Sequence, residues 1–343
     1  MTAAASPPPA RDEAAAGSFD CIVCGTCVAD ILVRPVPLSA AVGAGILFHV
    51  DPIEATTGGI VCNSGIALKR LGMRVAAASL VGDDLWADLV RRRLAGEGID
   101  TAALESDPRL ATSTTAALID PGGERSFAHH VGAPGRLDLA FVRRHLPQFA
   151  RSRMALVGYV GLLPALEPQL AEALAAIRGT GCAVALETAG SGGTLDTIAP
   201  ALPFVDVYAP SLDEAAHQTG LADPRAIIDR YRRHGAAGVV GVKLGSQGAV
   251  VAGPDGPVLE IPCIAAPGPV ADTTGAGDSF LAGLVAGILR GMPLRQAGLL
   301  GAATAACCVT GLGATAGLRD FAGTMDLVER FSTQSSAQFS TGH

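Results

Sequence analysis

The chain has 343 residues, of which 49% are hydrophobic, 17% are charged and 4% are aromatic, and its formal net charge is -7. This length allows one large α/β domain or two smaller ones, and the hydrophobic share allows a large buried core. Because the chain is acidic and has no long basic run, we expect no nucleic-acid partner.

The two ends of the chain differ in composition from the rest. Residues 1–18 are rich in Ala and Pro and contain no apolar signal-peptide segment, so we interpret them as a disordered leader. Residues 332–343 are rich in Ser, Thr and Gln and predict a disordered tail. The uncharged stretch 298–318 is about as long as a membrane span, but it is mostly Ala, Gly, Thr and Cys. It predicts a buried helix followed by a glycine-rich loop, and we expect no membrane partner.

The first predicted element is a buried strand, 19–33, that carries Cys21, Cys24 and Cys27. Their spacing is typical of iron–sulfur ligands. Alternate side chains of a strand point to opposite faces, however, so residues three apart cannot reach one metal ion. The sequence has eight cysteines and no export signal, and we expect free thiols in a reducing cytoplasm.

Short strands outside a main sheet are predicted in two regions. Residues 34–57 hold several prolines and glycines around the apolar run 46–50. Residues 112–119 and 126–131 are rich in strand-forming residues and are joined by a Pro-Gly-Gly-Glu turn, which predicts a hairpin.

Strand-like and helical patterns alternate along most of the remaining chain. Strands are predicted at 75–81, 154–160, 182–186, 205–209, 239–244 and 248–252, and helices at 85–94, 165–178, 194–201, 211–219 and 224–234. This alternation predicts a parallel sheet with helices on both faces. Ligands then bind at the carboxyl ends of the strands. Glu187, Ser211 and Lys243 follow such strand ends, so we expect them in one shared cleft.

The stretch 272–280, Asp-Thr-Thr-Gly-Ala-Gly-Asp-Ser-Phe, follows a strand-like run and opens an apolar helix. Gly275 and Gly277 allow a sharp turn and the close approach of a ligand. The free amides of this turn then point at one spot, where the helix dipole favours negative charge. Asp278 repels a bound anion, so the arrangement suits an anion that forms there: Asp278 takes a proton from an alcohol, and the amides hold a phosphoryl group in transit. The alternative is a helix N-cap, in which Asp278 only caps and the glycines only turn.

Two signatures resemble those of the ribokinase-like carbohydrate kinases, the PfkB family. The first is Gly58-Gly59, three residues and Asn63, followed by an Ala/Leu helix that ends in Leu-Gly. The second is the Asp-Thr-Thr-Gly-Ala-Gly-Asp run that ends at Asp278. The resemblance implies one α/β kinase domain at 19–331, with a mostly parallel central sheet, helices on both faces and a small β lid within about 30–57 and 112–131.

The resemblance also implies which residues act on the acceptor alcohol. The expected catalytic residues are Asp278, as the base, and the anion-hole residues Gly275, Ala276 and Gly277. The expected sugar-binding residues are Asp30, Gly58, Gly59 and Asn63. A carboxylate can accept from two neighbouring hydroxyls, and glycines let the sugar lie against the backbone. For Asp30, a solvated strand end is the alternative.

Sites for ATP and metal ions follow from the same resemblance. The expected nucleotide-binding residues are Lys243, Gly245, Ser246 and Gly248 from one turn, Ser211 from another, and Cys307, Gly311 and Gly313 from the helix and loop beside the adenine. Glu214 matches the Glu of the family's Pro-Asn-x-x-Glu motif and is expected to hold Mg²⁺ through water. Asp272 and the Thr274 carbonyl, with carbonyls of the adenine loop, are expected to hold a K⁺-like ion.

Two positions depart from the family pattern. Ser211 stands where the family has Asn, and Glu187 stands where it usually has Asp or Asn. Both substitutions keep polar oxygens but change their reach by about one bond, and Mg²⁺ demands good octahedral geometry. We therefore expect metal use to persist, while nucleotide preference and rate differ from those of relatives.

The sequence thus predicts an ATP-dependent kinase that transfers the γ-phosphoryl group to a hydroxyl of a sugar or sugar-like alcohol. A nucleoside kinase of the same family is the first alternative, although the low aromatic content disfavours base stacking. A sugar or nucleotide sensor with weak catalysis is the second, motivated by Ser211 and Glu187. Lid strands often pair between subunits in this family, so a homodimer through the lid is a further expectation.

Overall fold

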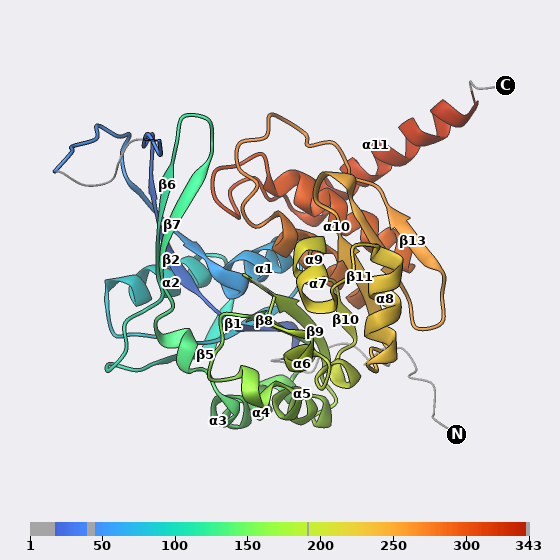
Figure 1. The fold of residues 1–343 in the computed structure, drawn as a ribbon, viewed down its shortest axis with the longest axis horizontal. Helices are drawn as coiled ribbons and strands as arrows, with labels where there is room; N and C mark the ends of the chain where they lie inside the picture. Colours follow the sequence, from blue (N-terminus) through green and yellow to red (C-terminus); the bar gives the residue numbers. More distant parts are fainter. Residues whose placement is uncertain (1–17, 40–44, 191, 341–343) are drawn as a thin grey trace.

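The computed structural model describes residues 18–39, 45–190 and 192–340, with side chains up to residue 334. Its larger sheet has nine strands in the order β13-β12-β11-β10-β9-β8-β1-β4-β5 (Figure 1). The strands are β1 (Phe19–Gly25), β4 (Val75–Val81), β5 (Asp100–Ser106), β8 (Ser152–Val160), β9 (Ala183–Thr188), β10 (Val207–Tyr208), β11 (Val239–Lys243), β12 (Ala249–Ala252) and β13 (Val258–Ile261). Neighbours from β11 to β5 run parallel, and the two pairs β11–β12 and β12–β13 are antiparallel. The predicted mostly parallel sheet is confirmed.

Helices cover both faces of this sheet, as the alternating pattern predicts (Figure 1). One face carries α1 (Gly59–Arg70), α2 (Leu85–Gly96), α9 (Ala276–Leu289), α10 (Leu294–Cys308) and α11 (Phe321–Ser340). The other carries α3 (Leu139–Arg144), α4 (Leu146–Ala150), α5 (Leu170–Gly179), α6 (Leu195–Ile198), α7 (Leu212–Thr219) and α8 (Pro224–Arg233). Within β1, Cys21 packs in the core on the face that carries α1 and α9, and Cys24 packs in the core on the opposite face. The sheet lies between these two thiols, so they cannot share a metal ion.

A second, four-stranded sheet in the order β3-β2-β6-β7 forms the lid beside the main sheet (Figure 1). Its strands are β2 (Val28–Val33), β3 (Glu54–Gly58), β6 (Thr114–Ile119) and β7 (Arg125–His130). β6 and β7 pair antiparallel as the predicted hairpin, while β2 pairs parallel to β6 and antiparallel to β3. The small β lid is confirmed, and the homodimer through it stays a prediction.

The first predicted strand, 19–33, is two strands in different sheets. β1 ends at Gly25, whose φ is 147°, and β2 begins at Val28. A Cβ atom on Gly25 would lie 1.3 Å from the carbonyl oxygen of Gly158, so only glycine fits where the chain turns. The amide of Thr26 donates to that same oxygen at 3.1 Å, and the chain then leaves the main sheet for the lid. Because both halves are apolar, the hydrophobic pattern alone does not reveal the turn.

The apolar run 46–50 is not a strand, contrary to the prediction. Ile46 and Leu47 are 51% and 79% exposed, and the third lid strand is Glu54–Gly58 instead. The edges of the lid sheet are β3 and β7, and the run 46–50 pairs with neither.

The C-terminal helix α11 extends to Ser340, so residues 332–340 are helical where composition predicts a disordered tail. The hydroxyls of Ser332 and Thr333 donate to carbonyls one turn earlier at 2.9 and 3.0 Å, so these polar side chains bond within the helix itself. Residues 1–17 of the predicted leader, and 341–343, lie outside the described residues. Among the described helices, none combines the length and the apolar character needed to cross a membrane.

Candidate active site

The two sequence signatures meet where helices α1 and α9 begin, and the first is a strand-to-helix junction rather than a loop. Asn63 donates from Nδ2 to Oδ2 of Asp278 at 2.8 Å, and the hydroxyl of Ser64 donates to the backbone carbonyl of Asp278 at 3.2 Å. Helix α1 begins directly after the lid strand β3, with no loop between Gly58 and Gly59, whereas α9 follows the long loop after β13. The fold therefore brings the two sequence signatures to one point.

Gly275 determines where helix α9 begins. It is the N-cap residue, with φ of 76°, and no side chain caps the helix. A Cβ atom on Gly275 would lie 2.4 Å from Cβ of Ala314, so glycine is required for the backbone angle and for the space. Asp278 lies inside the first turn, which argues against its interpretation as the N-cap. First-turn amides have no acceptor within their helix and can bind an anion, although the Ala276 amide here makes a 3.3 Å bond to the Thr273 carbonyl.

The carboxylate of Asp278 is buried and held by one of its oxygens. Oδ2 accepts from the hydroxyl of Tyr159 at 2.5 Å and from Asn63 at 2.8 Å. Among the described residues no side chain donates to Oδ1, which leaves that oxygen for a ligand. Burial raises the pKa of Asp278 above its ordinary value, while the bonds from Tyr159 and Asn63 and the nearby Lys243 ammonium lower it. Such a group suits a general base, which must be ionised and yet able to take up a proton.

Lys243 brings a positive charge to the first turn of α9. Its Nζ lies 3.3 Å from the point where a Cβ on Gly277 would stand, and it forms a buried ion pair with Glu187. Burial raises the pKa of Glu187 above its ordinary range, and the ammonium of Lys243 opposes this effect. Oε2 of Glu187 is buried with no hydrogen-bond partner in the described part of the chain. The Glu that departs from the family pattern thus anchors the lysine beside the predicted anion hole.

Ser211 and Glu214 form a capping box at the start of α7. The amide and the hydroxyl of Ser211 each donate to Oε2 of Glu214 at 2.8 Å. A backbone bridge between Ser211 and Lys243 places this helix end next to β11. Because the box uses only Oε2, Oε1 of Glu214 can face a metal-bound water. Ser211, which stands where the family has Asn, thus caps α7 and holds one oxygen of Glu214.

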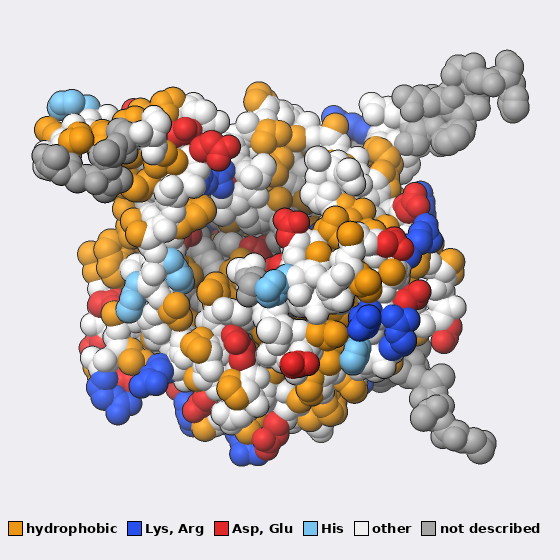
Figure 2. Space-filling model, viewed as in Figure 1, with side chains coloured by type: hydrophobic (Ala, Val, Ile, Leu, Met, Phe, Trp, Pro, Cys, Tyr) orange, Lys and Arg blue, Asp and Glu red, His pale blue; other side chains and the backbone are white. Residues whose placement is uncertain are grey.

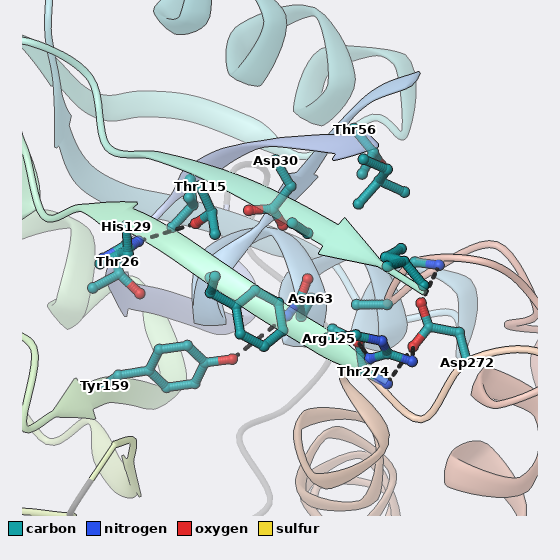
Figure 3. Close-up of a pocket in the computed structure, with 18 of the residues that line it drawn as sticks. Thr26, Asp30, Thr56, Asn63, Thr115, Arg125, His129, Tyr159, Asp272 and Thr274 are labelled. Atoms are coloured by element: carbon teal, nitrogen blue, oxygen red, sulfur yellow. Dashed lines mark hydrogen bonds and ion pairs between the residues drawn. The ribbon is translucent and has the colours of Figure 1, made fainter. Parts of the chain in front are cut away.

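A cavity of about 350 Å³ lies between the lid and the main sheet. Figure 2 shows the surface hollowed at this place, and Figure 3 shows the side chains around it. The predicted sugar ligands Asp30, Gly59 and Asn63 line the cavity, and Oδ1 of Asn63 is buried with no partner among the described residues. Burial raises the pKa of Asp30 to about 6, against a hydrogen bond from Thr115. Gly58 acts differently: a Cβ there would lie 2.1 Å from Oδ2 of Asp30, so this glycine makes room for the carboxylate.

Comparison with known proteins decides the family. The model of the pfkB family carbohydrate kinases matches residues 22–320 of the chain. The chain belongs to this family. An uncharacterised sugar kinase of Escherichia coli, YegV, is 29% identical, and the match covers 75% of this chain and 78% of that protein. The fructokinase of Klebsiella pneumoniae is 31% identical, and the match covers 71% of this chain and 80% of that protein. The structure of Arabidopsis thaliana ribokinase complexed with ribose and ATP has the same fold, with a TM-score of 0.78 at 21% identity over 91% of this chain and 99% of that one.

In this carbohydrate kinase, an arginine of the lid reaches the loop before α9. Nη2 of Arg125 pairs with Oδ1 of Asp272 at 2.6 Å, and Nη1 bonds to the hydroxyl of Thr274 (Figure 3). Asp272 also accepts from the amides of Thr274 at 2.7 Å and Gly313 at 2.8 Å. The predicted K⁺ site at Asp272 and Thr274 stays a prediction, and Arg125 already brings a positive charge to that carboxylate.

The predicted nucleotide turn of the kinase is exposed at the end of β11. Gly245 and Ser246 belong to a short 3₁₀ turn, and Gly248 closes it with φ of 90°. A Cβ on Gly248 would lie 2.1 Å from the carbonyl of Ile261, so this glycine is needed for strand packing. Gly245 has open space around it, as a residue that approaches a ligand requires.

The predicted nucleotide contact of Cys307 stays a prediction. Its side chain is fully buried in the core that joins α9, α10 and α11, so a contact would have to come from its backbone. Gly311 has a structural role, because a Cβ there would lie 2.3 Å from the amide nitrogen of Gly317. The predicted nucleotide contact of Gly311 also stays a prediction.

Sequence reasoning misses two residues of the site, Tyr159 and Arg125. Tyr159 lies near the carboxyl end of the predicted strand 154–160, and the rule that singled out other strand ends could have found it. Arg125 has no such signal, because it follows a hairpin turn and resembles an ordinary exposed charge. Its role depends on Asp272, which is distant in the chain.

Proposed function

We propose that this carbohydrate kinase transfers the γ-phosphoryl group of ATP to a hydroxyl of a neutral sugar or sugar-like alcohol, with Asp278 as the catalytic base. The observation that carries the proposal is the Asp278 carboxylate, buried in the first turn of α9 and bonded through Oδ2. Its two donors, Asn63 and Tyr159, line the cavity under the lid. An alcohol in that cavity can present its hydroxyl to Oδ1, beside amides that favour negative charge.

Oxygen acceptors in the cavity wall hold the sugar. Asp30 can accept from two hydroxyls at once. Oδ1 of Asn63 and Oγ1 of Thr26 are buried without hydrogen-bond partners among the described residues. An unpaired buried polar atom costs stability, so a ligand hydroxyl that bonds to either oxygen is favoured. These acceptors fit a ligand that carries several hydroxyls.

The transfer step moves one proton and one phosphoryl group. Oδ1 of Asp278 takes the hydroxyl proton as the alcohol oxygen bonds to the γ-phosphorus, and the bond from that phosphorus to the bridging oxygen of ADP breaks. The first-turn amides of α9 and the Lys243 ammonium stabilise the charge on the transferring group. Mg²⁺, which Glu214 would hold through water, supplies further positive charge to the phosphates.

Uncharged sugars are expected to be better substrates than anionic ones. Arg125 is paired with Asp272, and burial lowers the pKa of His129, which keeps its ring neutral near pH 7. The described residues that line the cavity therefore leave no positive charge for a substrate carboxylate or phosphate, and Asp30 repels one. With ATP, kcat/KM for ribose or fructose should exceed that for 2-keto-3-deoxygluconate or fructose 1-phosphate by at least about tenfold, which corresponds to about 1.4 kcal/mol of repulsion.

Release of ADP is measured with a panel of these four compounds, and release by Asp278→Asn is taken as the background rate. This measurement tests both the function and the substrate class. A preference for an anionic sugar would contradict the proposal that the substrates are neutral sugars, but it would be consistent with the kinase function. No release above background with any alcohol would contradict the kinase function. Tight sugar binding without release would instead favour a sensor, the alternative that Ser211 and Glu187 suggest.

A nucleoside is the second candidate substrate. Phe127 lines the cavity with 60% of its surface exposed and offers a face on which a base can stack. Adenosine and inosine therefore belong in the same panel, and turnover of either above that of ribose would favour a nucleoside kinase.

Binding of the sugar is expected to weaken in acid through Asp30. Its pKa is raised to about 6 by burial, so it is ionised at pH 7.5 and becomes protonated as the pH falls through about 6. A protonated carboxyl accepts fewer hydroxyl donors, so the sugar KM should rise several-fold between about pH 7.5 and about pH 5. In Asp30→Asn the KM should be high and independent of pH. A sugar KM that is flat over this range in the wild type would remove Asp30 from the binding site.

A further inference from the structure

The phenol of Tyr159 makes a short hydrogen bond to the proposed base. Tyr159 lies in β8, lines the cavity under the lid and donates to Oδ2 of Asp278 at 2.5 Å. Nδ2 of Asn63 bonds to the same oxygen at 2.8 Å and lies 3.5 Å from the phenol oxygen. Figure 3 shows the phenol pointing into the cavity toward Asn63. Neither sequence signature includes this tyrosine.

We propose that Tyr159 is a positioning residue for phosphoryl transfer, which holds Asp278 ionised and directs its free oxygen, Oδ1, toward the substrate hydroxyl. The proposal rests on the proposed role of Asp278 as the base. A carboxylate that accepts two hydrogen bonds at one oxygen can rotate little about its side-chain bonds. Oδ1 is then the oxygen that meets the alcohol.

The surroundings of Asp278 show why such a donor matters. The titratable groups that face it are Tyr159 from β8, Glu187 from β9, Glu214 from α7, Lys243 from β11 and Cys308 from α10. Burial and the neighbouring carboxylates favour the protonated acid, and the hydrogen bond from Tyr159 is the largest influence that lowers the pKa of Asp278. Burial, with Asp278 beside it, raises the pKa of Tyr159 well above its ordinary value, so the phenol remains a donor at working pH.

The backbone around Tyr159 is held in place. A Cβ on Gly158 would lie 2.9 Å from Cβ of Glu187, so β8 and β9 approach closely here. The amide of Leu162 donates to the Tyr159 carbonyl at 3.0 Å, and the ring packs against the core beneath α1 and α9. The phenol oxygen therefore has little freedom to move away from the carboxylate.

Tyr159→Phe removes only the hydroxyl and tests this role. We expect kcat to fall about tenfold and the acidic limb of kcat/KM to move up by about one pH unit, because losing a donor to the ionised form raises the pKa of the base. The KM for ATP should change little. Initial rates of ADP release between about pH 5 and about pH 9 measure these effects.

Tyr231→Phe is the matched control. Its hydroxyl bonds to Oε1 of Gln218 at 2.6 Å in the core, so the same atom is removed from a different network. This variant should keep the wild-type kcat and acidic limb. If the role of Tyr159 were only structural, Tyr159→Phe and Tyr231→Phe would behave alike. Both would then lose folding stability, and neither would move the acidic limb of kcat/KM.

A fluorinated tyrosine at position 159 keeps the ring and the hydroxyl and makes the phenol a stronger donor. It should move the acidic limb to lower pH, opposite to Tyr159→Phe, and it carries the test if Tyr159→Phe does not fold. An acidic limb that stays at its wild-type position in either variant would overturn the proposal. Full activity of Asp278→Asn would instead contradict the proposed base, which separates the two failures.

Discussion

Asp278→Asn is expected to lower kcat by about 10²–10⁴-fold, the usual contribution of a general base. The amide keeps the size of the side chain but cannot take up the hydroxyl proton. Affinity for ATP should not fall, because the carboxylate is not a ligand of the phosphates and its loss removes a repulsion. Steady-state ADP release measures the first effect, and a direct titration with ATP measures the second.

The variant should also fold, which separates lost chemistry from lost structure. Burial raises the folded-state pKa of Asp278 above its unfolded value, so the ionised carboxylate costs stability at pH values above that pKa. The melting temperature of Asp278→Asn should therefore equal or exceed that of the wild type near pH 7.5. Asp88→Asn is the control, because the Asp88 side chain is 61% exposed and loss of its charge should leave kcat unchanged. Wild-type turnover by Asp278→Asn would show that the proton leaves by another route.

Gly275→Ala is expected to lose both stability and activity. The new Cβ would stand 2.4 Å from Cβ and 3.0 Å from Cα of Ala314, so the loop after α10 has to move. A φ of 76° costs alanine about 1–2 kcal/mol, and the overlap adds about 1–3 kcal/mol. Because the movement changes the direction of the first-turn amides, kcat should fall by about 10²–10³-fold, as when an oxyanion donor is lost. Thermal unfolding and ADP release measure the two losses.

Gly291→Ala separates backbone strain from the steric clash. Gly291 follows the other end of α9 with φ of 71°, and no atom lies within 4 Å of its would-be Cβ. This variant should show the strain alone, as a lower melting temperature with unchanged kcat. If Gly275→Ala behaved in the same way, the contact with Ala314 would have no part in positioning the first turn.

Much of the site could be predicted because its signals are local. The alternation of apolar patterns indicates the parallel sheet, and the spacing of glycines and acids marks the helix starts that carry Asn63 and Asp278. The structure places both residues, together with Asp30, at or beside the cavity under the lid. A helix N-terminus and a carboxylate need only a few consecutive residues, and a short pattern suffices to find them.

Roles that depend on a distant partner could not be predicted in this way. The strand-end rule could have placed Tyr159 at the ligand edge of the sheet, but its bond to Asp278 exists only because β8 ends beside α9. Arg125 reads as a charge beside a hairpin turn, yet it pairs with Asp272 across the cavity. The burial of the Cys307 side chain is likewise decided by the packing of α10, which its neighbours in the sequence do not reveal.

The amino-acid pattern by itself determined the kind and order of most elements and the chemistry of the two glycine-rich loops. Only the tertiary structure divided 19–33 between two sheets, because the constraint at Gly25 is a contact with Gly158 on a neighbouring strand. It also decided which donors and charges surround Asp278, and hence the direction in which the pKa of that carboxyl moves. Local sequence shows where side chains are apolar and where the backbone can turn, whereas ion pairs, close contacts and shifted pKa values depend on distances between segments far apart in the chain.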